Sequence, residues 1–239
     1  MLLIMGLSFT HEMWARVLPG LAPHYRCIFF DNRGMGRSDV PDGPYSIRQM
    51  ASDAVAILDA AEVPAAHIVG ASMGGMIAQE LALRYPDRVL SLVLGCTSSS
   101  GVFARWPHFR FRPRGVKWSR AARLERELAL RPLLYADTTP EQRIEEDVRL
   151  RCECNWSYKG FFNQLVAILR WTSYYRLPRL RVRTLVMHGD QDHLVPVENG
   201  RVLASRIPGA RLALIRNAGH ILTTDQTEAC IEALLAFHQ

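Results

Sequence analysis

One serine lies among closely spaced glycines in the stretch "VGASMGG". The pattern G-x-S-x-G is centred on Ser72, follows an apolar run and precedes a helical pattern that begins at Met73. A sharp turn from strand to helix crowds the residues two before and two after the serine, so small residues are needed there, and it leaves Oγ exposed at the end of a sheet. Free N–H groups at the start of the helix favour a developing negative charge at the same place. The stretch therefore predicts a nucleophilic serine.

A serine hydroxyl becomes a nucleophile when a base accepts its proton and a third group orients that base. Behind a strand–turn–helix serine, the acid and then the histidine follow later in the chain. The segment "TLVMHGDQDHLVP" offers Asp190 and Asp192 after an apolar run, and "RLALIRNAGHILTTD" offers His220 after another. Each lies beyond the end of a predicted strand, where the sites of open α/β sheets gather. The residues alone leave both aspartates open as the acid.

Short apolar strands and helical patterns alternate along the chain and must position these residues. Near-continuous apolar strands in such an alternation predict a parallel sheet covered on both faces. The predicted strands are Leu2–Met5, Arg26–Phe30, His67–Val69, Val89–Gly95, Thr184–His188 and Arg211–Ile215. The predicted helices are His11–Ala22 with an interruption at Pro19, Ile47–Ala61, Met73–Arg84, Val197–Arg206 and Thr227–His238.

Residues 99–181 break this rhythm, because they are rich in arginine and aromatic residues and mostly helical in pattern. We interpret them as a helical lid inserted between the two parts of an α/β core, residues 1–98 and 182–239. The predicted fold class is α/β, with about six mostly parallel strands flanked by helices.

Composition argues against several other functions. The chain has 239 residues, 49% of them hydrophobic, which is enough for one sizeable core. Its five cysteines lack the paired spacing of zinc sites, so we expect no metal and no cofactor. The net charge of +6 comes without a recognisable nucleic-acid-binding pattern, and no apolar run approaches the roughly 20 residues that span a bilayer. We expect a cytoplasmic protein that binds neither nucleic acid nor membranes.

The chain resembles the α/β-hydrolase-fold serine hydrolases, in particular the lid-bearing esterases and lactonases. The matching segments are "IMGL", "FDNRGMGRSD", "VGASMGG", "HGDQDHLVP" and "NAGH", and they cover essentially the whole chain. The resemblance implies Ser72 as the nucleophile, His220 as the base and Asp192, the fourth residue of a G-x-x-D turn, as the orienting acid. Asp190 stays as the alternative acid, with a competing role in holding the turn.

The resemblance also implies an oxyanion hole made by two backbone N–H groups, those of Met73 and Leu7. Family members often have histidine where this chain has Met5. Because the donor is a main-chain N–H, the change from histidine to methionine does not remove it. The residues that support the loop of this donor are not specified by the resemblance. For the substrate pocket we expect apolar contacts from the lid and from the residue after the base, namely Trp106, Trp156, Phe162 and Ile221.

The implied activity is the hydrolysis of a small carboxylic ester or lactone. Serine at position 72 argues against the family's dehalogenases and epoxide hydrolases, which use aspartate there. Ala71 makes carbon–carbon bond cleavage less expected than ester or lactone cleavage, because the family's carbon–carbon bond hydrolases commonly have asparagine before the nucleophile. Carbon–carbon cleavage, or a non-catalytic binding or signalling role on the same fold, remains the alternative.

Family members usually begin with two further strands before the one that ends here near Met5. Without them, the strand Arg26–Phe30 would lie at the edge of the sheet. Its apolar sequence "RCIFF" would then be uncovered on one side. Since bare apolar edges invite pairing with another chain, we expect either a homodimer through this edge or reduced stability.

Overall fold

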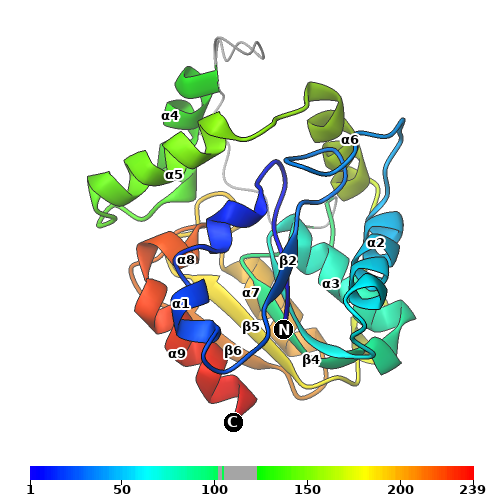
Figure 1. The fold of residues 1–239 in the computed structure, drawn as a ribbon. Helices are drawn as coiled ribbons and strands as arrows, with labels where there is room; N and C mark the ends of the chain where they lie inside the picture. The colour runs from blue at the N-terminus through cyan, green and yellow to red at the C-terminus, as the bar shows by residue number, and fades with distance from the viewer. Residues whose placement is uncertain (102–103, 105–122) are drawn as a thin grey trace.

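A six-stranded parallel sheet forms the centre of the molecule (Figure 1). The computed structural model describes residues 1–101, 104 and 123–239. Every predicted strand is confirmed to within two residues at either end, and the predicted α/β class is confirmed with them. The strand order is β2-β1-β3-β4-β5-β6. The strands are β1 (Leu2–Ile4), β2 (Ile28–Phe30), β3 (Ala66–Ala71), β4 (Val89–Gly95), β5 (Thr184–Gly189) and β6 (Arg211–Ile215).

Helices connect the strands as expected, with one correction. The single helix predicted for His11–Ala22 is two short pieces, because Pro19 suits the first turn of a helix but cannot continue one. These pieces are η1 (His11–Trp14) and α1 (Leu18–Leu21). The other helices outside the insertion are α2 (Ile47–Ala60), α3 (Met73–Arg84), η2 (Pro86–Arg88), α7 (Glu198–Arg206), α8 (Leu222–Asp225) and α9 (Thr227–His238).

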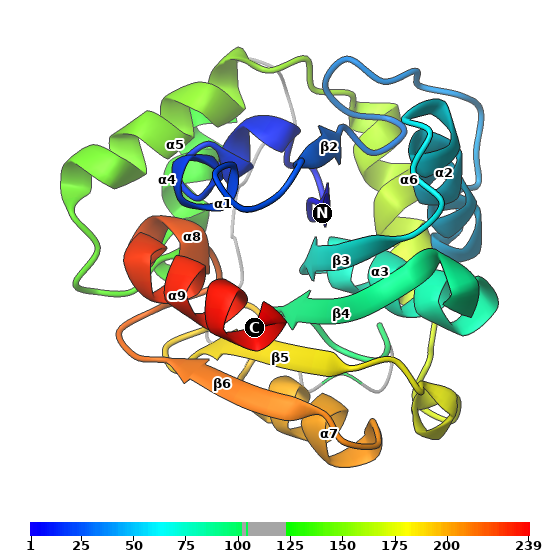
Figure 2. The ribbon, with the colours of Figure 1, turned by 60° about the horizontal axis from the view of Figure 1, so that its bottom comes forward.

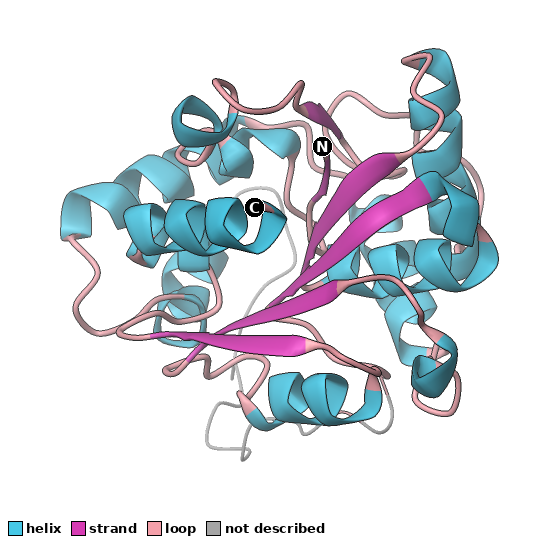
Figure 3. Ribbon diagram, turned by 90° about the horizontal axis from the view of Figure 1, so that it is seen from below, coloured by secondary structure: helices cyan, strands magenta, loops and turns pink. Residues whose placement is uncertain are grey.

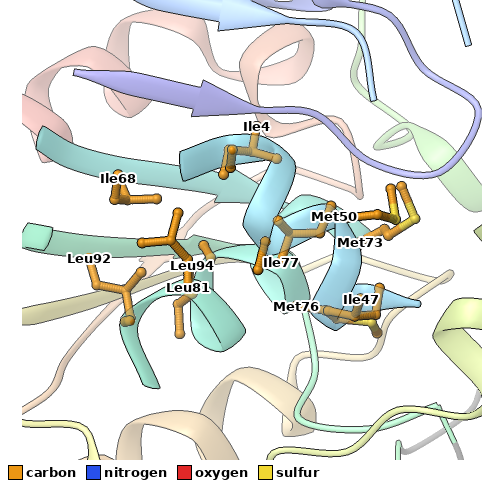
Figure 4. Packing of buried hydrophobic residues seen from close by; sticks show 14 of the residues in the cluster. Ile4, Ile47, Met50, Ile68, Met73, Met76, Ile77, Leu81, Leu92 and Leu94 are labelled. Atoms are coloured by element: carbon orange, nitrogen blue, oxygen red, sulfur yellow. The ribbon is translucent and has the colours of Figure 1, made fainter. Parts of the chain in front are cut away.

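Helices cover both faces of the sheet (Figures 2 and 3). Alternating side chains of the strands build a core on each face. In β1, Leu2 and Ile4 pack on one side with α2, α3 and α7, and Leu3 packs on the other side with α1 and α9. This is the two-residue period of an extended strand. Figure 4 shows part of the first core, in which α2 packs against α3 and which includes Met50 of α2 and Ile77 of α3. Both faces are therefore covered, as the apolar strands predicted.

The chain changes direction across the sheet between β1 and β3. It passes from β1 to β2 on one side and returns to β3 on the other, so the connections after β1 and β3 diverge to opposite faces. A crevice forms at such a switch point, outside the carboxyl ends of the strands. Leu7 follows β1 and Ser72 follows β3, so the fold brings these two loops to the same crevice.

Three helices of the segment between β4 and β5 lie at the top of Figure 1, far from the C-terminus. They are α4 (Arg123–Leu134), α5 (Glu141–Glu153) and α6 (Tyr158–Leu169), and the short η3 (Leu177–Arg179) follows them. The Ser157 side chain caps α6 by accepting a hydrogen bond from the Gly160 N–H. No helix of the described residues is long and apolar enough to cross a membrane.

The strand β2 lies at one edge of the sheet, as predicted. Among the described residues it pairs with β1 alone. Phe29 at its centre is 40% exposed and stacks on His11, with 5.5 Å between the ring centroids. An exposed apolar edge favours pairing with a second chain. We predict that the protein forms a homodimer through β2 at high concentration.

Size-exclusion chromatography with light scattering checks this prediction. The natural sequence should give a dimer mass and Phe29→Lys a monomer mass, because a charged side chain on an edge strand opposes pairing. Leu214→Lys is the matched control, since Leu214 is 39% exposed on the opposite edge strand β6. A monomer for the natural sequence, or a dimer lost only in the Leu214 variant, would contradict the prediction.

Candidate active site

Ser72 occupies the turn between β3 and α3 in a strained backbone conformation. Its φ of 56° lies in the left-handed region that residues with a side chain rarely adopt. Hydrogen bonds on both sides hold it there. The Ser72 N–H donates to the Gly95 carbonyl at 2.8 Å, and the Ser72 carbonyl accepts from the Thr97 hydroxyl at 2.6 Å. Strain that is held in this way is typical of functional positions.

The glycines around Ser72 are required by close backbone contacts. A Cβ atom at Gly74 would lie 2.0 Å from the Ile4 carbonyl oxygen, and one at Gly70 would lie 2.2 Å from the Gly74 carbonyl oxygen. No side chain fits at either place. The spacing G-x-S-x-G is thus required by the tight packing of α3 behind the turn.

Ser72, His220 and Asp192 form a continuous chain of hydrogen bonds. Ser72 Oγ lies 3.0 Å from His220 Nε2, and His220 Nδ1 lies 2.9 Å from Asp192 Oδ2. His220 and Asp192 are both buried. The three residues come from loops after β3, β5 and β6, which end at the same edge of the parallel sheet. This geometry lets the imidazole accept the serine proton while the carboxylate fixes its orientation.

Asp192 is built into its loop as an ionised carboxylate. Its Oδ1 accepts the backbone N–H groups of Leu194 and Val195 at 3.0 and 2.7 Å. Burial works to raise the pKa of this carboxyl, but His220 and hydrogen bonds from His188 and His220 outweigh it and hold the pKa well below its usual value. The alternative acid, Asp190, is exposed, and its Oδ1 accepts the Ala218 N–H at 3.4 Å.

His188 is a second histidine on this carboxylate, to which the sequence assigned no role in the site. It is completely buried at the end of β5, and its Nε2 lies 2.7 Å from the Val195 carbonyl and 3.5 Å from Asp192 Oδ2. A carbonyl oxygen only accepts, so Nε2 carries the proton. His188 therefore braces the loop that presents Asp192. Its position directly before the G-x-x-D turn is the sequence feature that could have identified it as part of the site.

The two expected oxyanion donors border the serine. Met73 is the first residue of α3, so its N–H has no acceptor within its own helix. The loop of Leu7 approaches from β1, where a Cβ atom on Gly6 would lie 3.0 Å from Ser72 Cβ. Leu7 also lines the cavity over the serine.

Two amide side chains support the Leu7 loop, in which Met5 stands where family members often have histidine. Asn32 Nδ2 donates to the Met5 carbonyl at 2.8 Å, and Gln164 Oε1 accepts the Ser8 N–H at 3.1 Å. Gln164 is fully buried and comes from α6 of the insertion. The sequence did not predict either contact, because the partners are far apart along the chain.

An apolar cavity of about 350 Å³ opens on Ser72 and His220. Of the expected substrate contacts, Trp156 and Ile221 line this cavity. Phe162 does not line it: its side chain is 39% exposed, and the preceding residue, Phe161, lines the cavity instead. Trp106 lies outside the described residues. Lining residues that the sequence did not predict include Phe9, Met13, Trp14, Met76, Leu130, Leu165, Ile168 and Met187.

One group of charged side chains stands beside this apolar surface. Arg126 and Glu127 line the cavity and are nearly fully buried, as is Arg151 behind them. Glu127 lies 3.7 Å from Arg126 and 3.2 Å from Arg151, so one carboxylate faces two guanidinium groups. The Arg126 guanidinium also lies 4.5 Å from the ring centroid of Trp156.

Known proteins match this chain along its whole length. A poly(3-hydroxyalkanoate) depolymerase of Ectopseudomonas oleovorans is 30% identical over 247 residues, covering 100% of this chain and 84% of that protein. A putative carbamate hydrolase RutD of Azorhizobium caulinodans is 31% identical, covering 99% of this chain and 89% of that protein. The crystal structure of the enol-lactonase from Burkholderia xenovorans LB400 superposes with a TM-score of 0.85 at 26% identity, covering 99% of this chain and 90% of that one. The sequence profile of the alpha/beta hydrolase fold matches residues 1–131 and 147–225. With the parallel sheet and the serine turn, this match shows that the chain belongs to the α/β hydrolase family.

Proposed function

We propose that the protein is a serine hydrolase that cleaves carboxylic esters or lactones through an acyl-enzyme on Ser72. The observation that carries this proposal is the hydrogen-bond chain from Ser72 through His220 to Asp192 at the wall of an apolar cavity. The names of the depolymerase and the enol-lactonase among the similar proteins support an ester or lactone as the substrate.

The reaction proceeds by acyl transfer in two steps. His220 Nε2 takes the proton of Ser72 as Oγ attacks the substrate carbonyl, and the oxyanion accepts hydrogen bonds from the N–H groups of Leu7 and Met73. The oxyanion then collapses, the C–O bond to the leaving alcohol breaks, and His220 protonates the alkoxide. Water, activated by His220, hydrolyses the acyl-enzyme and releases the carboxylic acid. In a lactone the alcohol stays attached to the acyl chain.

The insertion serves as the lid over this site. Its helices contribute Leu130 from α4 and Phe161 and Leu165 from α6 to the cavity wall. The boundaries proposed from the sequence, residues 99–181, enclose all of these residues. An apolar lid keeps bulk water from the carbonyl and strengthens the electrostatic interactions inside.

The cavity favours an acyl group that is largely apolar and has a negatively charged end. The Arg126 guanidinium lines the otherwise apolar cavity and is nearly fully buried. A carboxylate on the substrate would accept a charge-assisted hydrogen bond from this guanidinium.

Paired substrates test the charge preference. The natural enzyme should hydrolyse mono-p-nitrophenyl glutarate with a higher kcat/KM than the neutral p-nitrophenyl pentanoate. Arg126→Gln should lower kcat/KM for the anionic ester by about tenfold or more, the loss of one hydrogen bond to a charged group, and leave the neutral ester nearly unchanged. Arg131→Gln is the matched control on the same helix, because Arg131 pairs with Glu141 on the surface. Equal losses on both esters would contradict the charge preference.

Rapid quench followed by mass spectrometry tests the proposed function itself. A slow ester should leave its acyl group on the peptide that contains Ser72, and hydroxylamine should remove that group. A panel of esters of graded chain length beside lactones would then define the substrate. An ester that binds normally but leaves no adduct and no acid product would favour a non-catalytic protein on this fold.

A further inference from the structure

The last residue of α4 and the connection from α4 to α5 contact the residues on both sides of His220. The Ile221 N–H donates to the Leu134 carbonyl at 3.0 Å. On the other side, a Cβ atom on Gly219 would lie only 2.8 Å from the carbonyl carbon of Tyr135. The loop that presents the proposed base is thus packed directly against the insertion, far away in the sequence.

One buried carboxylate links the two segments. Asp225 Oδ2 accepts the Gly219 N–H at 2.6 Å, and its Oδ1 accepts the Thr139 hydroxyl at 2.6 Å. The backbone N–H of Ala136 donates to the same carboxylate. Asp225 is 5% exposed and lies at the end of α8, five residues after His220. It therefore joins the residue before the base to two residues of the insertion.

A second buried carboxylate fastens α8 from the side of α5. Asp147 Oδ2 accepts the hydroxyl groups of Thr224 at 2.6 Å and Tyr135 at 3.1 Å. Arg143 Nη1 donates to the Thr224 carbonyl at 2.9 Å. Thr224 directly precedes Asp225, so these bonds fix the position of the Asp225 carboxylate as well.

The Asp225 carboxyl is buried, and its hydrogen bonds stabilise its ionised form against the cost of that burial. Burial raises the pKa of the Asp225 carboxyl to about 6, and hydrogen bonds from Thr139, Gly219 and Ala136 offset only part of that rise. The charged and titratable groups around it are Asp147, whose charge raises this pKa further, Tyr135 and Cys230. Near neutral pH the group is an ionised acceptor, which is what two backbone N–H groups and a hydroxyl require.

We propose that Asp225 is a positioning residue for the base. Its bond to the Gly219 N–H holds the His220 ring at hydrogen-bond distance from Ser72. Its bonds to Thr139 and Ala136 make this placement depend on the insertion being packed against the core. The inference rests on the proposed function. Asp225 touches neither the substrate nor the reacting atoms. A displacement of the imidazole by about 1 Å can slow a reaction by about 10²-fold.

Steady-state kinetics of two variants test the proposal. Asp225→Ala should lower kcat for p-nitrophenyl pentanoate by about 10²-fold while KM changes by less than about threefold, because the cavity is left intact. Thr139→Val should lower kcat by about tenfold, since the carboxylate still holds Gly219 but loses its link to the insertion. If both act through one unit, the double variant should be no slower than Asp225→Ala.

Asp225→Asn and Asp137→Ala serve as the conservative variant and the matched control. The asparagine keeps one acceptor oxygen, so it should recover part of the lost kcat. Asp137 is an exposed acid in the same connection, so removing its side chain should change nothing. A natural value of kcat in Asp225→Ala, or equal changes of kcat and KM, would overturn the proposal.

Labelling of Ser72 by a fluorophosphonate separates this proposal from the proposed function. If the natural protein is labelled and hydrolyses the ester, the proposed function stands and kcat of the variants decides the role of Asp225. If the natural protein is neither labelled nor active, the proposed function fails, and the positioning role fails with it. The melting temperature of each variant shows whether it is folded, and Thr139→Val covers the case in which Asp225→Ala is not.

Discussion

Ser72→Ala is expected to lower kcat/KM for an ester by about 10⁴-fold or more and to leave the fold intact. The variant has no Oγ to attack the carbonyl, so only the oxyanion donors and substrate binding remain, and these supply a small residual rate. His220→Ala should be nearly as slow, because the hydroxyl loses the acceptor that lies 3.0 Å away. The two losses should not add, since both residues act in one proton transfer. Ester turnover and acyl-adduct mass spectrometry measure these effects.

Ser98→Ala is the matched control for this prediction. Ser98 lines the same cavity, and its Oγ donates to the Ser100 carbonyl at 3.0 Å rather than to a histidine. The same chemical change should therefore cost less than about threefold. If Ser72→Ala kept more than a tenth of the natural rate while folded, Ser72 would not be the nucleophile.

Asp192→Asn is expected to cost about 10⁴-fold in kcat, as in a comparable triad. The amide NH2 of asparagine would face His220 Nδ1 and favour the ring tautomer with its proton on Nε2. That nitrogen could then no longer accept the Ser72 proton. The variant also removes the ionised acceptor of the Leu194 and Val195 N–H groups, so its melting temperature should fall.

Asp190→Asn separates the two candidate acids. Asp190 is exposed two residues earlier in the same turn, and its side chain accepts a long hydrogen bond of 3.4 Å from the Ala218 N–H. Its amide variant should keep at least a third of the natural activity. A crippled Asp190→Asn beside a near-natural Asp192→Asn would show that the acid has been assigned to the wrong residue.

The sequence by itself determined the sheet, its covered faces and the residues that could form a triad. Each of these is encoded locally. A continuous apolar run such as Leu2, Leu3 and Ile4 specifies a strand buried on both sides, because successive side chains point to opposite faces. The small residues around Ser72 report a backbone crowded by the next helix, whatever surrounds it. The order of a parallel sheet then brings the loops after β3, β5 and β6 to one edge.

The tertiary structure alone decided how the site is supported and which side chains line it. Phe161 and Phe162 are chemically alike and adjacent, and only the direction in which α6 faces its neighbours puts the first in the cavity and the second at the surface. Gln164 holds the Ser8 N–H across 156 residues, and Asp225 holds Thr139 across 86. Such contacts leave no periodicity in the sequence, because they depend on where separate elements meet once both are packed. The physical reason is that a buried polar group must find its partner in space, and chain order does not specify which one it finds.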